Sequence, residues 1–301
     1  MHPSNAPTLR SMLPHLDKAF VSFLDEYSAR EVSTTVWAWG HLAHTPDEET
    51  WAHARHTLLR PASASRPDAG AARGDPRIDS QRPDYAENSS SRFRPARSMT
   101  GRHPPPSPSR LLCSATPQAL ALLSWGLHQI RCHDDDVWEA VAAACRASPS
   151  SLQPRDLANV LWAFASAGRH DALLFSELAT VCIDRILDFT PQDLSNTAWA
   201  FAAVGHPYRP LFDAIAGASQ RLLGGFAPLG LANLVWAFAS ARAPAPELFE
   251  SVARESMGQH LQGFSPSQAT MMAWAFSYNP VPTQPRLLTS ISRLAAVNLE
   301  V

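Results

Sequence analysis

The segments QPRDLANVLWAFASAG (residues 153–168) and TPQDLSNTAWAFAAVG (residues 190–205) decide the fold, because they are two copies of one pattern, 37 residues apart. The tryptophan of this pattern recurs along the chain at Trp37, Trp125, Trp162, Trp199, Trp236 and Trp274. From Trp125 onward the intervals are 37, 37, 37 and 38 residues. A fixed period of roughly 20 to 50 residues indicates one supersecondary unit that is copied and stacked. The sequence therefore predicts a repeat protein.

Each unit is predicted to hold two helices, A and B. Helix A begins at a proline eight residues before the tryptophan, at Pro117, Pro154, Pro191, Pro228 and Pro266. Proline is favoured at the first helical position because the N–H that it lacks would be unpaired there. Helix B carries one apolar stripe at i, i+3, i+4, i+7 and i+11, as in Phe175, Leu178, Ala179, Cys182 and Ile186. The expected fold is all-α, an α-solenoid of helical hairpins with a 37–38-residue period and about six and a half units.

The repeat register divides the chain into three parts. Residues 1–60 hold an N-terminal half unit, whose helix B is Leu13, Leu16, Phe20 and Leu24, and the first full unit around Trp37. The chain thus begins in mid-repeat, as a fragment or a truncated gene model would. Residues 61–110 form an insertion that is expected to interrupt helix B of the first unit, since Trp37 and Trp125 are 88 residues apart. Residues 111–301 hold five further units.

The insertion and the array differ in composition and charge. Residues 61–110 are rich in Pro, Ser, Arg and Gly and hold nine Arg against five Asp and Glu. Such a segment buries too little apolar surface to offset its ordering entropy, so we expect it to be disordered. It is interpreted either as a basic tail that follows phosphates or as a solvated loop or retained intron. Residues 111–301 are acidic, with 11 Arg against 15 Asp and Glu.

One face of helix A carries the tryptophan together with the residues seven and three before it and four after it, when the helix is drawn at about 100° per residue. Its polar members vary between units, and they are the candidate binding residues: Arg30, Thr34, Gln118, Gln129, Arg155, Asn159, Ser166, Gln192, Asn196, Asn233, Ser240, Ser267 and Tyr278. The opposite face is apolar and is expected to pack in the core.

Two interpretations of this polar face remain. In the first, its side chains contact successive bases, because amides pair donors with acceptors and arginine contacts phosphate or stacks. In the second, the tryptophans fill the seam between units, since large aromatic residues dominate burial, and Asn159, Asn196 and Asn233 satisfy nearby backbone groups. The second is favoured for the tryptophans and the asparagines. The variable positions seven before the tryptophan, such as Arg155 and Gln192, are the better candidates for base recognition.

The sequence carries no pattern of an enzyme, a metal site or a cofactor site. His41 with His44 and His53 with His56 have i, i+3 spacing, but no acidic or cysteine ligand completes either pair. The acids at positions 134–136 are expected to begin a helix B, where negative charge favours the helix dipole. There is neither a phosphate-binding glycine loop nor a nucleophile elbow. We therefore expect no catalysis, no metal, no cofactor and no small-molecule substrate.

Membrane insertion and targeting are also not expected. The twenty uncharged residues from Leu222 to Ala241 have the length of a membrane span, but the repeat register puts a helix end and Pro228 inside them. No signal peptide or organelle-targeting segment is visible. Cys145 and Cys182 share one repeat position and are expected to pack in the core of a reduced protein.

The segments PRDLANVLWAFASAG and PQDLSNTAWAFAAVG resemble the octotricopeptide repeat, a helical-hairpin repeat of about 38 residues that is abundant in algae. The similarity covers about 240 residues and is most specific in units three to five. It implies an α-solenoid that binds single-stranded RNA, about one nucleotide per unit, in chloroplast or mitochondrial RNA processing, stabilisation or translation. A scaffold that binds protein partners without RNA is the alternative, because an acidic array neutralises phosphates poorly.

Overall fold

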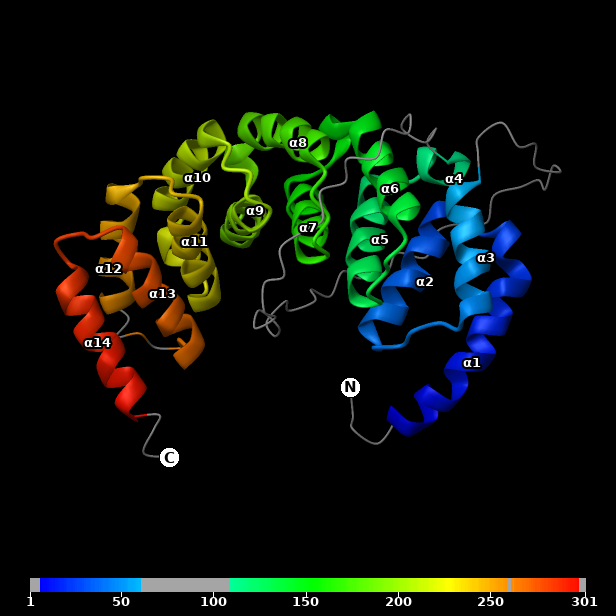
Figure 1. Cartoon of the computed structure of the whole chain (residues 1–301), viewed down its shortest axis with the longest axis horizontal. Helices are drawn as coiled ribbons and strands as arrows, with labels where there is room; N and C mark the ends of the chain where they lie inside the picture. The colour runs from blue at the N-terminus through cyan, green and yellow to red at the C-terminus, as the bar shows by residue number, and fades with distance from the viewer. Residues whose placement is uncertain (1–5, 61–108, 259–260, 262, 298–301) are drawn as a thin grey trace.

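The computed structural model of the chain describes residues 6–60, 109–258, 261 and 263–297 (Figure 1). In these ranges the regular secondary structure is helical, with fourteen α-helices and no β-strand. The prediction of an all-α protein is therefore confirmed. The predicted disordered insertion lies outside the described residues, except for Ser109 and Arg110.

The helices form two series that alternate along the chain. The helices with the repeated tryptophan, called the inner helices, are α2 (Ala29–His41), α5 (Pro117–Gln129), α7 (Pro154–Ser166), α9 (Pro191–Ala203), α11 (Pro228–Ser240) and α13 (Pro266–Tyr278). The outer helices are α1 (Ala6–Phe23), α3 (Glu48–Leu59), α6 (Asp135–Ala147), α8 (Ala172–Asp184), α10 (Arg209–Arg221), α12 (Pro246–Gly258) and α14 (Gln284–Val297). Figure 1 shows an arch with the inner helices on its concave side and the outer helices on its convex side. Each series packs neighbour on neighbour, as in an α-solenoid.

The inner helices begin where the sequence predicts. Five of them start at the predicted prolines, and the residue before each proline is extended. In three of them a hydroxyl on that residue accepts the N–H three residues on, at 3.2–3.3 Å, from Thr116, Thr190 and Ser265. Each such cap satisfies one N–H that would otherwise lack an intrahelical partner.

The first five inner helices end in one backbone motif. Six residues after the tryptophan, the backbone turns to positive φ, between 50° and 68°, at Ala43, Arg131, Gly168, Gly205 and Arg242. In α7 the N–H of Gly168 donates to the Ala165 carbonyl at 3.0 Å, and the N–H of Arg169 donates to the Phe164 carbonyl at 2.8 Å. The other four helices repeat this pair of hydrogen bonds. The pattern is a Schellman motif, which requires the left-handed conformation whichever residue occupies the turn.

In five places an edge-to-face aromatic pair joins an outer helix to the inner helix that follows it. The pairs are Phe20–Trp39, Trp138–Phe164, Phe175–Phe201, Phe212–Phe238 and Phe249–Phe276, with centroids 4.8–5.2 Å apart and ring planes at 72–84°. All ten side chains are at most 4% exposed. We call these the edge-to-face pairs. They connect one hairpin to the next through the centre of the core, where such geometry adds to the gain from burial.

The insertion follows a helix instead of interrupting it, which corrects the prediction. Helix α3 has 12 residues, against 13 in α6, α8, α10 and α12. The short helix α4 (Arg110–Cys113) then packs on α3 and α6. It takes the place of the 3-10 turns that follow other outer helices: η2 (Leu24–Glu26), η3 (Pro149–Ser151), η4 (Ile186–Asp188) and η5 (Leu223–Gly225). A break at a surface turn leaves the hairpin intact, as insertions between elements do.

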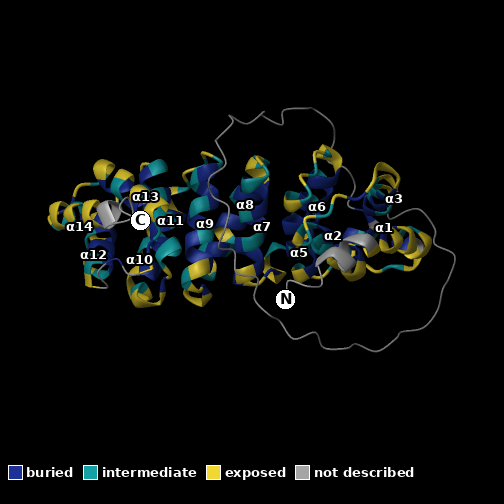
Figure 2. Cartoon of the chain, turned by 90° about the horizontal axis from the view of Figure 1, so that it is seen from below, coloured by how far each residue is buried: buried dark blue, intermediate teal, exposed yellow. Residues whose placement is uncertain are grey.

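The N-terminal half unit, helix α1, differs from the prediction at one residue. Leu13, Phe20 and Leu24 are buried, as expected, but Leu16 is 54% exposed. It lies with Met12 and Phe23 on one side of α1, which no described helix covers. Figure 2 shows exposed residues gathering at this edge and at helix ends, while the middles of the helices are buried. None of the described helices combines the length and apolar character that crossing a membrane requires.

Candidate functional site

The repeated tryptophans lie side by side on the inner helices. We call the set Trp37, Trp125, Trp162, Trp199, Trp236 and Trp274 the Trp ladder. Ring centroids of adjacent units are 6.2–6.4 Å apart in four pairs, with ring planes inclined by 29–38°. The tryptophans thus lie between units, as expected. They are not fully buried, however: Trp125 is 7% exposed, Trp274 is 40% exposed, and the other four lie between these values in exposure class.

Helix geometry explains why the Trp ladder stays accessible. Side chains two residues apart on an α-helix point in directions that differ by about 200°, because each residue turns the helix by about 100°. Phe201 points toward the outer layer, where it meets Phe175, so Trp199, two residues earlier, points to the concave side. The tripeptide Trp-Ala-Phe therefore places one aromatic ring in the core and another at the inner surface.

The candidate residues of the polar face lie at or near the surface. Seven residues before the tryptophan, the polar side chains are exposed: Arg30, Gln118, Arg155, Gln192 and Ser267. Three before it, Asn159, Asn196 and Asn233 are half-buried, and exposed Thr34 donates to the Arg30 carbonyl at 2.8 Å. Four after it, Ser166 and Ser240 are half-buried while Gln129 and Tyr278 are exposed. The Tyr278 ring lies 4.9 Å from that of Trp274.

The three asparagines do not satisfy the backbone, contrary to the expectation. Within the described residues no hydrogen bond is formed by the side chain of Asn159, Asn196 or Asn233, and the Oδ1 atom of Asn233 is buried without a partner. The buried hydroxyl of Ser166 also has no partner there. Buried polar atoms are paired in most native proteins, so the unpaired atoms of Asn233 and Ser166 need an explanation. Here they lie beside accessible tryptophans.

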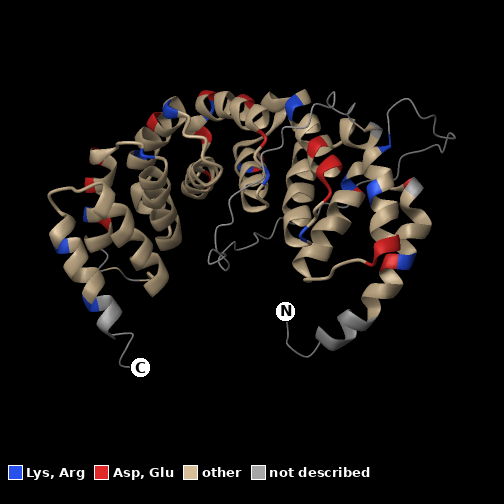
Figure 3. Cartoon of the chain, viewed as in Figure 1, with Lys and Arg blue, Asp and Glu red and all other residues tan. Residues whose placement is uncertain are grey.

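The inner helices carry very little charge. Among all six, the Asp, Glu, Lys and Arg residues are Arg30, Glu31, Arg155, Asp156 and Asp193. The three carboxylates each accept the backbone N–H three residues before them, at 2.7–3.3 Å, and so cap their own helices. Burial raises the pKa of Asp156. Figure 3 shows the concave side almost without coloured residues, whereas charges gather on the outer helices and loops.

Six arginines of the outer layer are paired, whereas Arg221 and Arg286 have no ion pair among the described residues. Arg55 lies 2.9 Å from Asp134 and 2.6 Å from Asp136, and Arg169 pairs with Asp135. The acids at positions 134–136 do begin helix α6, as predicted, but they also tie it to its neighbours. Four more outer-layer pairs are Arg146–Asp171, Arg185–Asp188, Arg209–Asp213 and Arg254–Glu250. The pairs of Arg55, Arg146 and Arg169 join neighbouring outer segments, whereas the other three lie within one helix or turn.

Sequence reasoning missed two arginines near the polar face. Arg131 and Arg242 end α5 and α11 in the left-handed conformation, with exposed side chains. In the described part of the chain neither guanidinium has a hydrogen bond or an ion pair. The signal was present in the sequence, since both stand six residues after the tryptophan, where Gly168 and Gly205 stand in other units.

Two histidines contact the Trp ladder, and one of them, His41, stacks on Trp37 with ring centroids 5.0 Å apart. The ring of His128 is edge-on to that of Trp162, at 5.2 Å. Burial, and then the charge of Arg131, lowers the pKa of His128 from 6.5 to about 4. The imidazole is therefore neutral at physiological pH and packs as an aromatic ring.

His44 and His53, from the two i, i+3 pairs, and the buried cysteines make contacts that support the fold. His44 Nε2 lies 2.7 Å from the buried Asp17 carboxylate, which also accepts the indole N–H of Trp39 at 3.0 Å. His53 Nδ1 lies 2.8 Å from the Glu49 carbonyl within its own helix. Among the described residues no three His, Cys, Asp or Glu side chains are grouped as a metal site would need. Cys145 and Cys182 are buried free thiols, as expected, and burial raises their pKa values.

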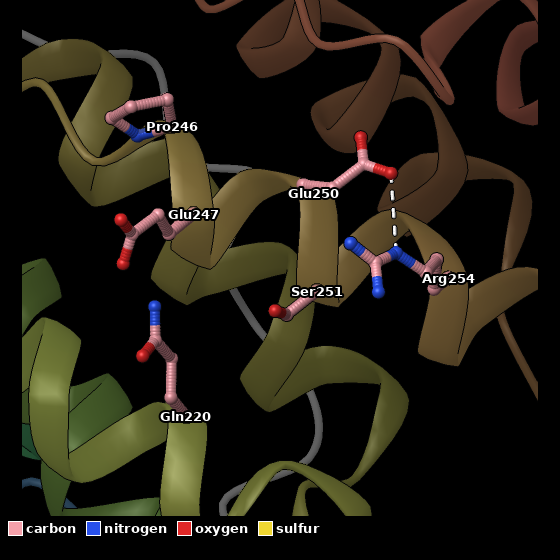
Figure 4. A pocket seen from close by; sticks show the side chains of 6 residues that line it. All are labelled: Gln220, Pro246, Glu247, Glu250, Ser251 and Arg254. Atoms are coloured by element: carbon pink, nitrogen blue, oxygen red, sulfur yellow. Dashed lines mark hydrogen bonds and ion pairs between the residues drawn. The ribbon is translucent and has the colours of Figure 1, made fainter.

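An open hollow of about 410 Å³ lies between α10 and α12 on the convex side (Figure 4). Its principal charged groups are already engaged: Glu250 accepts from Arg254 at 3.1 Å and from the N–H and hydroxyl of Thr283. The Thr283 hydrogen bonds hold the pKa of Glu250 below its usual value. This contact fastens α12 to the start of α14, so the hollow is explained by packing.

Comparison of the chain with protein-family models gives no match, and comparison with curated proteins gives no relative. The inner helices carry the features that bear on function. Accessible tryptophans, amides without partners and a scarcity of charge coincide there.

Proposed function

We propose that the chain is an array of 37–38-residue helical hairpins, about six and a half in number, whose concave side binds single-stranded RNA. The proposed repeat is supported by helix starts at Pro117, Pro154, Pro191, Pro228 and Pro266. The half unit is α1, which precedes the first complete hairpin of α2 and α3. The array has no catalytic role in this proposal.

The observation that carries the RNA proposal is the Trp ladder with its row of asparagines. Bases stack on aromatic side chains with about 1–3 kcal/mol per base, whatever the sequence. Amides hydrogen-bond to base edges, and an unpartnered amide gains most from doing so, since its desolvation is already incurred in the free protein. The Oδ1 atom of Asn233 is buried in this way. Asn159 and Asn196, half-buried at the same position in the two preceding units, also form no side-chain hydrogen bond within the described residues.

The spacing of the Trp ladder favours a splayed single strand. Rings of adjacent units are 6.2–6.4 Å apart, whereas stacked nucleotides in a duplex rise about 3.4 Å. One nucleotide per unit therefore requires unstacked bases, which is how single-stranded RNA is recognised by repeat proteins. Six tryptophans give a footprint of about six nucleotides. The resemblance to octotricopeptide repeats supports a role in chloroplast or mitochondrial RNA processing, stability or translation.

In this arrangement the bases face the inner helices and the phosphates face solvent. Only Arg30 and Arg155 bring positive charge to these helices. Exposed side chains seven before the tryptophan then supply selectivity, because they differ between units while the asparagine recurs. Arg155 and Gln192 in neighbouring units are the principal candidates.

Selection of ligands from a random RNA pool tests the proposal. We expect enrichment of a motif of about six nucleotides and saturable binding by fluorescence anisotropy. The double variant Arg155→Ala/Gln192→Ala should lose preference at two adjacent positions of the motif. Its control is Gln220→Ala/Arg221→Ala, which removes the same residue types from exposed positions on α10 and should change nothing. If the unaltered chain shows no saturable RNA binding at low salt, the proposal is wrong.

The scarcity of charge on the inner helices favours a second candidate, a scaffold for an extended peptide. Aromatic and amide side chains also suit a peptide, and stacked hairpins offer concave surfaces to such ligands. A peptide complex should survive nuclease and high salt and should be lost in Trp199→Ala. RNA binding should instead weaken as salt rises.

A further inference from the structure

The ends of the inner helices impose a backbone conformation that arginine disfavours. The φ angles at Arg131 and Arg242 are 55° and 51°, beside 68° at both Gly168 and Gly205. Glycine adopts this region freely, whereas a Cβ comes close to the following carbonyl oxygen there. The Schellman hydrogen bonds are nevertheless complete: the N–H of Arg131 donates to His128 at 3.0 Å, and that of Arg242 to Ala239 at 3.1 Å.

Local structure does not explain why arginine stands there. The turn forms with glycine in two other units, so the arginine side chains contribute nothing to its hydrogen bonds. A cation at a helix C-terminus is favoured by the helix dipole, but that benefit does not require the one position with positive φ. Ala43 adopts the same conformation in the first unit, at φ 50°, so the turn tolerates this strain and the strain alone assigns no role. It is the cost that the exposed charge of Arg131 and Arg242 must offset.

Arg131 and Arg242 lack the acidic partners that six arginines of the outer layer have. Among the described residues Arg221 and Arg286 lack them as well, but these two stand on the outer helices α10 and α14 and not beside a repeated tryptophan. Arg55, Arg146, Arg169, Arg185, Arg209 and Arg254 all have acidic partners. Arg131 and Arg242 are exposed and have no such partner among the described residues. Their charge is therefore available to an anion.

Arg131 is close to the Trp ladder. Its charge acts on His128, whose ring contacts Trp162. Arg242 occupies the same position relative to Trp236. Both residues thus stand just past the C-terminus of an inner helix, six residues after its tryptophan, with exposed side chains.

We infer that Arg131 and Arg242 contact phosphates of the bound RNA strand, at nucleotides that lie three units apart. This inference rests on the proposed RNA binding and adds to it the residues that hold the backbone. Arginine suits the role because its guanidinium donates to two phosphate oxygens at once. Between the two contacts, Gly168 and Gly205 leave the strand without a cation at this position, so the phosphates there remain in solvent.

The test is the double variant Arg131→Gly/Arg242→Gly, in which binding and stability move in opposite directions. Glycine relieves the left-handed strain, so the thermal unfolding midpoint should rise. Loss of two phosphate contacts should weaken binding of the selected RNA about tenfold or more at 50 mM salt, and should reduce the slope of log K against log salt by about 1.4. The base preference should stay the same.

The control is Arg221→Ala/Arg286→Ala, which removes two exposed arginines from outer helices. It should leave both affinity and salt slope as they are. If the double glycine variant keeps the salt slope of the unaltered chain while RNA binding persists, the inference is wrong but the proposed function stands. If the unaltered chain binds no RNA, both fail together. A lower unfolding midpoint in the glycine variant would show that the arginines support the fold, and would overturn the argument from strain.

Discussion

Two aromatic series run along the molecule, and they differ in burial although both recur once per unit. The edge-to-face pairs meet at nearly right angles and are at most 4% exposed. The Trp ladder has rings inclined by 29–38°, and it reaches 40% exposure at Trp274. The pairs connect inner to outer helices, whereas the Trp ladder connects inner helices to one another.

The difference in burial between the two aromatic series distinguishes two reasons why a residue recurs with the repeat period. A residue recurs in a repeat protein when every unit needs it for packing on the next, or when every unit presents it to a ligand. The edge-to-face pairs satisfy the first reason completely, because no part of them reaches solvent. The Trp ladder combines both, and this is why the proposed binding site lies along it.

The largest expected loss of unfolding free energy comes from removing one ring of an edge-to-face pair. Phe201→Ala should cost about 3–5 kcal/mol of unfolding free energy, because it leaves a cavity opposite Phe175. Trp199→Ala, two residues away, should cost on the order of 1–2 kcal/mol, since its ring is partly exposed. Urea unfolding followed by circular dichroism measures both. Equal losses would mean that the Trp ladder is as much a part of the core as the pairs.

A second prediction concerns how closely the inner helices approach. A Cβ at Gly126 would lie 2.7 Å from the Val36 carbonyl, in the backbone of α2. Gly126→Ala should therefore push α5 away from α2 and cost about 2–3 kcal/mol. Because this contact sets the spacing of Trp37 and Trp125, their mutual fluorescence quenching should also change.

Gly217 provides the matched control for this substitution. It lies on α10, and a Cβ there would meet nothing within 4 Å. Gly217→Ala should therefore stabilise the chain by about 0.5–1 kcal/mol through helix propensity. Destabilisation at both positions would indicate that the two layers are packed equally tightly.

The third prediction uses His128, whose ring contacts Trp162 of the Trp ladder. Its folded pKa of about 4 lies below the ordinary 6.5, so its stabilising contribution is complete above pH 6.5 and is lost as pH falls toward 4. Between pH 7.5 and 5 the loss should be about 2 kcal/mol. His128→Gln should remove this part of the pH dependence, as measured by chemical denaturation at each pH.

Substitution of the exposed His133 by Gln is the control and should leave the pH profile unchanged. If the unfolding free energy of His128→Gln depends on pH as that of the unaltered chain does, protonation of His128 does not destabilise the fold. In that case the Trp ladder would be more open to water around Trp162 than its packing indicates.

Much of the architecture was predictable because each signal is local. The prolines and hydroxyl caps fix the starts of the inner helices through backbone hydrogen bonds within one turn. Gly168 and Gly205, six residues after their tryptophans, are local signals of a helix end, whereas Arg131 and Arg242 make the same left-handed turn without glycine. The predicted position of the insertion, inside helix B of the first unit, was wrong. The position depends on where α3 ends, and the end of α3 carries no local sequence signal.

The candidate site was only partly predictable. The face of helix A followed from the helical angle, and its members are indeed exposed or half-buried. The roles of Asn159, Asn196 and Asn233 could not be assigned, because hydrogen-bond partners depend on neighbouring helices that the sequence does not place. The pairing of acids at positions 134–136 with Arg55 and Arg169 was missed for the same reason.

The sequence by itself determined the helices, their order and the face on which each repeated residue lies, because these depend on hydrogen bonds and side-chain directions within one hairpin. Tertiary structure alone decided which aromatic series is buried, which arginines are paired and which amides are left without partners. Each of these depends on the distance and angle between one hairpin and the next. That geometry makes the Trp ladder, and not the equally periodic edge-to-face pairs, the surface available to a ligand.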